Sequence, residues 1–128
     1  MIVASTGKAI EESGSPAEDP ETIDIEGVSA RTELVLGMQL STTTREDMER
    51  SLPAVVAHLN RLLDVDLGQN KDPGVQALMR DGIRLIEHGK RPTTETPTFG
   101  VFLYLRDTAL IARRLLWVYA EQNGVSTP

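Results

Sequence analysis

The strongest constraint on the fold comes from residues 98–123, the longest predicted helix of the chain. At roughly 100° per residue, its apolar residues cover an arc of roughly 240°. This arc consists of Val101, Leu105, Thr108, Ala109, Ile111, Ala112, Leu115, Leu116, Val118 and Tyr119. A helix this apolar must be covered on two or three sides. The sequence therefore predicts that residues 98–123, which end at Asn123–Gly124, lie at the centre of a helical fold.

The remaining arc of this helix combines charged residues with large apolar ones. The charged residues are Arg106, Asp107, Arg113, Arg114 and Glu121, and the apolar ones are Leu103, Leu110 and Trp117, which recur every seven residues. Three explanations stay open. Arginine stems or the N-terminal helix cover the apolar residues. Alternatively, the face is an interface for a protein partner or a second copy, formed by Arg106, Leu110, Arg113, Arg114 and Trp117. In the third explanation its arginines form a fork for an anionic small molecule.

Two further segments have clear helical patterns. Thr43 and Glu46 form a capping box that begins a helix ending at Gly68. We expect a bend near Pro53, or a restart capped by Ser51, because proline removes one amide donor.

The next helix begins with Asp72 as the cap and Pro73 as the first helical residue, and Gly89 ends it. Gly82 lies at the centre of its buried stripe, where we expect another helix to approach closely. The stripe consists of Val75, Leu78, Met79, Ile83, Leu85 and Ile86.

The segment from Ser29 to Gly37 predicts a short helix, with Ser29 as its cap and Gly37 ending it in the left-handed conformation. Apolar residues alternate over residues 33–40, so a strand is the alternative. We favour the helix because no partner strand lies nearby. The fold class predicted is all-α: an up-and-down bundle of three long helices plus a short N-terminal helix, formed by residues 29–124.

Residues 1–28 are predicted to be an acidic, disordered tail, because they offer too little apolar surface to offset the entropy of ordering. Residues 1–27 contain one lysine and seven acidic residues, which accounts for the whole net charge of −6. Residues 22–28 alternate weakly, so an edge strand formed on docking is an alternative. The body is neutral and has no basic stripe, which argues against nucleic-acid binding.

The composition also excludes several classes of site. The chain has no cysteine, so disulfides, thiolate catalysis and cysteine-ligated metals are excluded. The two histidines lie on different helix faces and no phosphate-binding loop is present, so we expect neither a metal nor a cofactor. We find no signal peptide and no apolar window of about 20 residues. We therefore expect a cytoplasmic protein without a membrane partner.

The residues with catalytic potential are few. His58 lies at the edge of an apolar stripe, where it is either a hydrogen-bonded boundary residue or a general acid/base. Tyr104 is expected at the edge of the core, with its hydroxyl seeking a partner. His88 is expected to be solvated near a helix end.

Three stretches resemble a family of small, uncharacterised actinobacterial helical proteins that are labelled as natural-product biosynthesis proteins. The stretches are AHLNRLL at 57–63, DPGVQALMRDGIRLIEHG at 72–89 and LIARRLLWVYAEQ at 110–122. Ala57-His58-Leu59 is similar to a Gly-His-apolar step of the family, and Ile111-Ala112-Arg113 to a Leu-Ala-Arg step. Val56 stands where the family has an arginine, so an Arg–His pair on this helix is in doubt. The resemblance implies a setting in secondary metabolism, and it directs attention to His58 and Arg113.

The sequence thus favours a small accessory or binding protein that acts through a face of the last helix or a groove between helices, with a homodimer, a protein partner or a small-molecule ligand as its partner. Whether the protein is an enzyme stays open. One alternative is a cofactor-free cyclase or isomerase in which His58 transfers a proton and Arg113 binds an oxyanion or carboxylate. Another is a regulator that binds a protein and uses the acidic tail.

Overall fold

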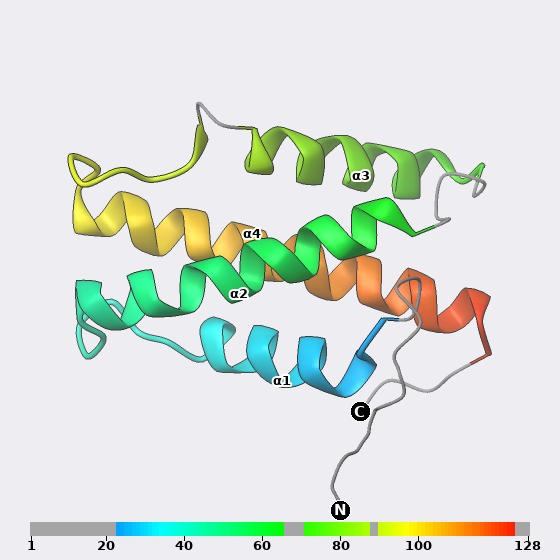
Figure 1. Cartoon of the computed structure of the whole chain (residues 1–128). Helices are drawn as coiled ribbons and strands as arrows, with labels where there is room; N and C mark the ends of the chain where they lie inside the picture. Colours follow the sequence, from blue (N-terminus) through cyan, green and yellow to red (C-terminus); the bar gives the residue numbers. More distant parts are fainter. Residues whose placement is uncertain (1–22, 66–70, 88–89, 125–128) are drawn as a thin grey trace, which may run out of the picture.

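A computed structural model describes residues 23–65, 71–87 and 90–124, and these residues form four α-helices in up-and-down order (Figure 1). The helices are α1 (Ile25–Leu36), α2 (Arg45–Asp64), α3 (Pro73–Ile86) and α4 (Thr98–Gln122). Consecutive helices run in opposite directions. The prediction of a helical bundle is therefore confirmed, and the strand alternative for residues 33–40 is wrong because residues 33–36 are the last turn of α1.

The helix α1 begins five residues earlier than the sequence predicted. Its cap is Asp24, whose side chain accepts a hydrogen bond from the Gly27 backbone N–H at 3.0 Å, whereas Ser29 is buried inside the helix. The prediction that Ser29 caps this helix was wrong, because Asp24 is an equally good cap and the earlier start buries Val28. Gly37 ends the helix as predicted, but at φ −85°, not in the left-handed region. Residues 23–28, assigned to the tail, thus belong to the packed structure, and residues 1–22 lie outside the described residues.

The helix α2 runs through Pro53 without a break, so the predicted restart at Ser51 does not occur. Thr44, not Thr43, caps it by accepting a hydrogen bond from the Asp47 backbone N–H at 3.1 Å. The helix ends at Asp64, and the predicted stop at Gly68 falls outside the described residues.

Arg45, the first residue of α2, binds the backbone of the segment that leads into α4. Its guanidinium donates hydrogen bonds to the backbone carbonyls of Thr93 and Thr96, and it also pairs with Glu49 at 2.8 Å. The start of α4 is therefore held against the start of α2.

The helix α3 starts as predicted, with Asp72 as the cap and Pro73 as the first residue. Gly82 is buried where α2 and α4 both approach: a Cβ at this position would lie 3.3–3.4 Å from Leu59, Leu63 and Ile111. The predicted stripe is only partly right, because Ile83 is exposed. The helix ends at Ile86, and the predicted stop at Gly89 falls outside the described residues.

The core is built by three helices, and α3 lies against it as an outer helix. The helix α4 contacts all the other three, whereas α1 and α3 contact each other nowhere and flank the α2–α4 pair from two sides (Figure 1). Gly82 is the sole buried residue of α3. The buried apolar residues form two clusters: one of Ile23, Val28, Leu59, Leu62, Ala112, Leu115 and Leu116, and one of Val35, Met48, Val55, Val101, Leu105 and Ala109.

Candidate functional site

The outward face of α4 is the charged arc that the sequence singled out. Arg106, Asp107, Arg114 and Glu121 are exposed and Arg113 is half-buried. Trp117 is 55% exposed and Leu103 is 39% exposed, so within the described residues neither α1 nor the arginine stems cover them. Phe99, four residues before Leu103, is also 55% exposed on this side. The sequence analysis missed Phe99, although its spacing from Leu103 is helical.

Arg113 turns away from this face toward α1. Its guanidinium lies 3.5 Å from the Ser29 carbonyl oxygen and 3.4 Å from the Thr32 hydroxyl oxygen. The Thr32 hydroxyl itself donates to the Val28 carbonyl at 2.8 Å. Arg113 therefore contributes to the α1–α4 contact, where its contacts are long and weak.

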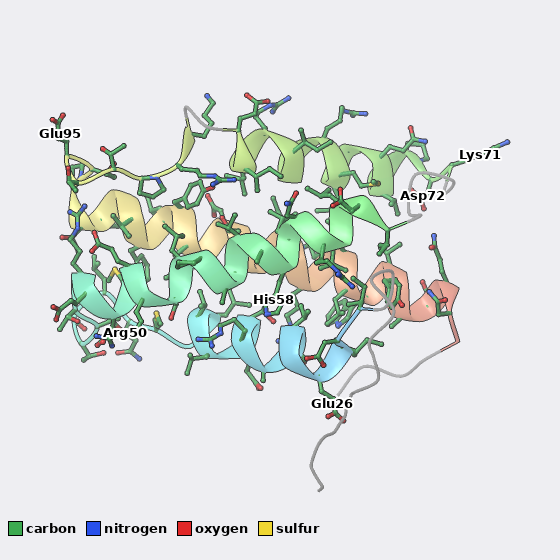
Figure 2. All side chains as sticks on the ribbon, viewed as in Figure 1. Glu26, Arg50, His58, Lys71, Asp72 and Glu95 are labelled. Atoms are coloured by element: carbon green, nitrogen blue, oxygen red, sulfur yellow. The ribbon has the colours of Figure 1, made fainter. Side chains whose placement is uncertain are left out.

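His58 lies on α2 at the border with α1 and is half-buried (Figure 2). Burial lowers the pKa of His58, the positive charge of Arg31 on α1 lowers it further, and the carboxylate of Asp24 opposes them. Because burial and Arg31 both disfavour the imidazolium, His58 is predominantly neutral near pH 7.

The structure does not bring His58 and Arg113 into one groove. His58 faces Asp24 and Arg31, whereas Arg113 faces Ser29 and Thr32. Asp24 and Arg31 lie at the edge of the buried side of α1, whereas Ser29 and Thr32 are buried within it. The histidine and the arginine therefore have different neighbours on α1.

Tyr104 is buried on α4 and joins that helix to the end of α3. Its hydroxyl donates a hydrogen bond to the Leu85 carbonyl, one of the last carbonyls of α3. Burial raises the pKa of Tyr104, against smaller opposing effects of Arg91 and Thr108. The phenol therefore stays protonated. Its hydrogen bond to the Leu85 carbonyl satisfies an acceptor at the end of α3, so we assign Tyr104 a structural role.

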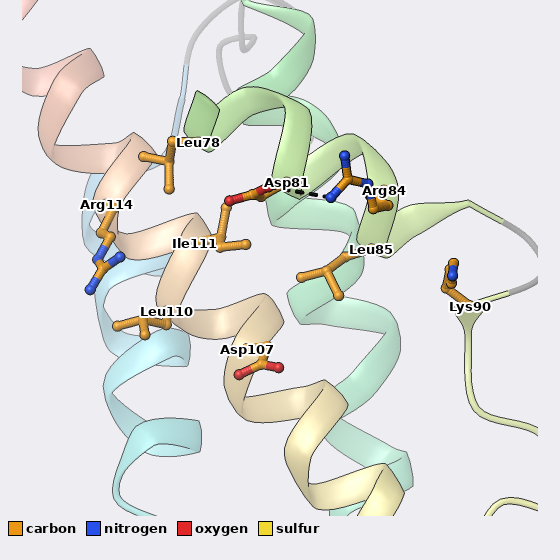
Figure 3. A pocket seen from close by; sticks show the side chains of 9 residues that line it. All are labelled: Leu78, Asp81, Arg84, Leu85, Lys90, Asp107, Leu110, Ile111 and Arg114. Carbon is orange, nitrogen blue, oxygen red and sulfur yellow. Dashed lines mark ion pairs between the residues drawn. The ribbon is translucent and has the colours of Figure 1, made fainter. Parts of the chain in front are cut away.

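A cavity of about 400 Å³, open to solvent, lies between α3 and α4. Its floor is formed by Leu78 and Leu85 of α3 and by Leu110 and Ile111 of α4 (Figure 3). Five charged side chains stand around this floor: Asp81, Arg84, Lys90, Asp107 and Arg114. The volume lies in the range of small-molecule sites, and five of the nine lining residues are charged, so a ligand with a charged group fits this cavity better than a purely apolar one.

The charges around the cavity are unequally paired. Asp81 and Arg84 form an exposed ion pair at 3.8 Å. The side chains of Lys90, Asp107 and Arg114 make no ion pair or hydrogen bond with any other described residue. Figure 3 shows Arg114 at one end of the apolar floor and Lys90 at the other. The cavity therefore offers a ligand two cations that have no partner among the described residues, at separate ends of an apolar floor.

The sequence identified Leu110 and Arg114 of this cavity but not the residues that α3 contributes. The missing information was the register of α3 against α4, which brings Leu78 and Leu85 beside Ile111 and Leu110. In the described parts of the chain, no three His, Asp or Glu side chains lie close enough together to hold a metal ion.

The chain matches no protein-family model, and neither a curated protein nor a solved structure is significantly similar to it. None of the four described helices is long and apolar enough to cross a membrane. The candidate site therefore rests on its geometry alone.

Proposed function

We propose that this protein is a small helical binding protein whose α3–α4 cavity takes an elongated, largely apolar molecule that carries an anionic group. The observation behind this proposal is the unpaired guanidinium of Arg114 at the end of a four-residue apolar floor. A planar guanidinium offers two parallel donors to a carboxylate or phosphate. An accessory role in actinobacterial secondary metabolism, and a cytoplasmic location, belong to the same proposal and rest on the sequence alone.

Each part of the ligand has a matching part of the cavity. The apolar body would lie on Leu78, Leu85, Leu110 and Ile111. The anionic group would pair with Arg114, and Lys90 gives the other end a positive potential. Asp107, between them on α4, would disfavour an anion in the middle of the cavity, so the charge is expected at one end.

The enzymatic alternative has less support from this arrangement. A cyclase or isomerase that uses His58 and Arg113 needs both groups within reach of one substrate. The two side chains have different neighbours on α1, and the α3–α4 cavity contains neither residue. Tyr104, the third candidate, has its hydroxyl engaged by the Leu85 carbonyl.

The test compares three amphiphiles with the same chain length and different headgroups. Decanoate, 1-decanol and decyltrimethylammonium are titrated, below their aggregation concentrations, into the full-length ¹⁵N-labelled protein. We expect saturable binding of decanoate, with shifted amide signals at residues 78–85 and 107–114. The neutral and cationic probes should bind at least roughly tenfold more weakly, since a charge-assisted hydrogen bond contributes about 1.5–3 kcal/mol.

The matched variants are Arg114→Gln and Arg50→Gln. Arg50 is an exposed arginine of α2 that pairs with Asp47 and lies outside the cavity. Arg114→Gln should weaken decanoate binding at least roughly tenfold, and Arg50→Gln should leave it unchanged. Equal binding of all three probes, or equal effects of both variants, would show a non-specific apolar surface and contradict the proposal.

A further inference from the structure

We infer that a second copy of this chain docks on the outward face of α4, antiparallel to it, about a two-fold axis at Leu110. The contact surface is an apolar row, here called the α4 stripe, that consists of Phe99, Leu103, Leu110 and Trp117. This inference goes beyond the proposed ligand site, because Phe99, Leu103 and Trp117 lie outside the cavity.

Three of the four residues of the α4 stripe are exposed and are not covered by any described residue, and Leu110 at its centre is half-buried. Phe99, Leu103 and Trp117 are among the large apolar residues that the described part of the chain leaves exposed. They follow one side of a 25-residue helix at steps of four and seven residues, which keeps them in one row. Contiguous exposed apolar rows of this kind mark interaction sites, and tryptophan is enriched among the residues that dominate binding energy.

Three residues of the α4 stripe, Leu103, Leu110 and Trp117, are spaced symmetrically about Leu110, as a two-fold contact requires, whereas Phe99 would face the partner's Glu121. Leu103 lies seven residues before Leu110, and Trp117 lies seven residues after it. In an antiparallel pair centred on Leu110, Leu103 faces the partner's Trp117, and its symmetry mate repeats the contact. Leu110 then faces the partner's Leu110 at the centre. One residue row thereby forms three apolar contacts with its own copy.

The charges on one flank of the stripe are complementary in the same register. Asp107, three residues before Leu110, and Arg114, four residues after it, lie on the same flank of α4. A two-fold rotation brings like flanks together, so Asp107 lies beside the partner's Arg114. The pair occurs twice by symmetry. Neither side chain has a partner among the described residues of its own chain, so in the ligand-free protein each is available for this contact. Both residues also line the cavity, so the partner's Asp107 and an anionic ligand would compete for Arg114.

The other flank carries Arg106 and Arg113, which the same rotation brings toward the partner's Arg113 and Arg106. This pairing is repulsive. Arg113 is turned onto α1, where it contacts Ser29 and Thr32, and this reduces the repulsion at the stripe. The contact is therefore attractive on one flank and mildly repulsive on the other, which makes Arg106 a position where a charge change should tighten the dimer.

The acidic residues 1–22 are the rival occupant, because the outward face of α4 has more arginines than acids. They contain only short apolar stretches, whereas the α4 stripe needs apolar residues at steps of about seven. A second copy supplies those residues in matching register, and we therefore assign the stripe to it.

The first experiment measures self-association and the environment of Trp117, the single tryptophan of the chain. Sedimentation velocity of the full-length protein over a wide concentration range should show a monomer–dimer equilibrium. Tryptophan emission should shift to shorter wavelength along the same isotherm, as the indole leaves water. Trp117→Ala should weaken the dimer roughly 30-fold or more, the effect expected for an interface hot spot. Lys90→Ala, at the cavity but not on the stripe, should leave the dimer unchanged.

The second experiment tests the register through charge reversal. Asp107→Arg should weaken the dimer by placing two arginines together, and adding Arg114→Asp should restore it, because the pair is then reversed on both sides. Arg106→Glu should tighten the dimer through contact with the partner's Arg113. Circular dichroism of each variant checks that the exposed substitutions leave the fold intact.

Several results would overturn this inference. A monomer at all concentrations, or a dimer that Trp117→Ala leaves unchanged, contradicts it. Failure of the reversed pair to restore the dimer contradicts the two-fold register. Emission that is independent of concentration but moves to longer wavelength when residues 1–22 are removed assigns the stripe to the acidic segment. These measurements are made without decanoate, because Leu110, Asp107 and Arg114 belong to both the cavity and the dimer contact, so a ligand would compete with the second copy for Arg114. Trp117→Ala lies outside the cavity, so loss of the dimer in this variant tests the dimer contact without removing a cavity residue.

Discussion

The two borders of α4, with α1 and with α3, differ in how completely they are filled. At the α1 border, the buried residues Val28, Thr32 and Val35 lie against α4 and α2, and Arg113 reaches over to backbone and hydroxyl oxygens. At the α3 border, the helices meet closely at Gly82, and a cavity opens beside that contact. The short helix α1 therefore provides core, whereas α3 provides one wall of a site.

This difference teaches that length and amphipathicity do not decide which helix is central. The helix α1 has 12 residues and four of them are buried, whereas α3 has 14 residues and only Gly82 is buried. A glycine lets α3 approach closely at one point, and Leu78, Met79 and Ile86 pack against the core on either side of it while staying only half-buried. Lys90, Asp107 and Arg114, which have no partner among the described residues, line the cavity between α3 and α4. A ligand can enter there because the two helices do not pack completely against each other.

The largest expected effect is on the free energy of unfolding, and it compares two leucines of α4. One leucine lies in the closed core and the other lines the open cavity. Leu115 is fully buried in the core, and Leu110 is half-buried at the cavity. Leu115→Ala should lower the free energy of unfolding by about 3 kcal/mol, and Leu110→Ala by about 1 kcal/mol, because the second leaves no closed cavity. Urea denaturation at concentrations where the chain is monomeric measures both. Equal losses would mean that the α3 border is as well packed as the α1 border.

The next effect tests the single close approach of α3. In Gly82→Val the Cβ alone would lie 3.3–3.4 Å from Leu59, Leu63 and Ile111, and the two methyl groups need further space, so we expect α3 to move outward. We expect a loss of about 2 kcal/mol in the free energy of unfolding. Arg80→Val, on the exposed side of the same helix, is the control for helix propensity and should cost less than about 1 kcal/mol. If the two variants lose the same stability, Gly82 is not a packing constraint.

A smaller effect tests the link between α4 and the end of α3. Tyr104→Phe removes the hydroxyl that donates to the Leu85 carbonyl. The variant should lose about 1 kcal/mol of unfolding free energy, and amide hydrogen exchange should accelerate in the last turn of α3 but not in α1. Uniform acceleration across all four helices would instead indicate a general loss of core packing.

The smallest effect is a pH dependence that arises at the α1–α2 border. Because the pKa of His58 is lowered in the folded state by burial and by Arg31, protonation favours the unfolded chain. The stability contribution is therefore complete above the unfolded pKa of 6.5 and is lost as the pH falls through the lower folded pKa. His58→Gln should flatten the stability curve in this range relative to the wild type. Unfolding curves measured between about pH 5 and 8 check this, and identical wild-type and variant slopes would contradict it.

Local signals in the sequence predicted much of the fold correctly. Asp72–Pro73 marked the start of α3, Asn123–Gly124 marked the end of α4, and Gly82 marked a close approach of helices. These signals depend on neighbours within one turn or on the absence of a side chain, so the sequence carries them directly. Where two capping residues competed, as at Asp24 and Ser29, the local signal was ambiguous and burial of Val28 decided between them.

The sequence could not predict which helices contact each other or in what register. Helix periodicity placed Ile83 in the buried stripe of α3, but α3 packs through a narrower side and leaves Ile83 exposed. Periodicity also allowed His58 and Arg113 to border one groove, but the tertiary structure gives the two side chains different neighbours on α1. The cavity residues Leu78 and Leu85 could be recognised only once the register of α3 against α4 was known.

The sequence by itself determined that this chain forms helices around a nearly all-apolar central one, and that the outward arc of that helix combines arginines with Leu103, Leu110 and Trp117. Periodicity and capping are local properties, so they can be read residue by residue. The tertiary structure alone decided that α1 completes the core, that α3 stands off to leave a cavity beside Arg114, and that Trp117 faces solvent. These outcomes depend on which helices touch and in what register, which is a balance of many distant contacts and not a property of any one segment.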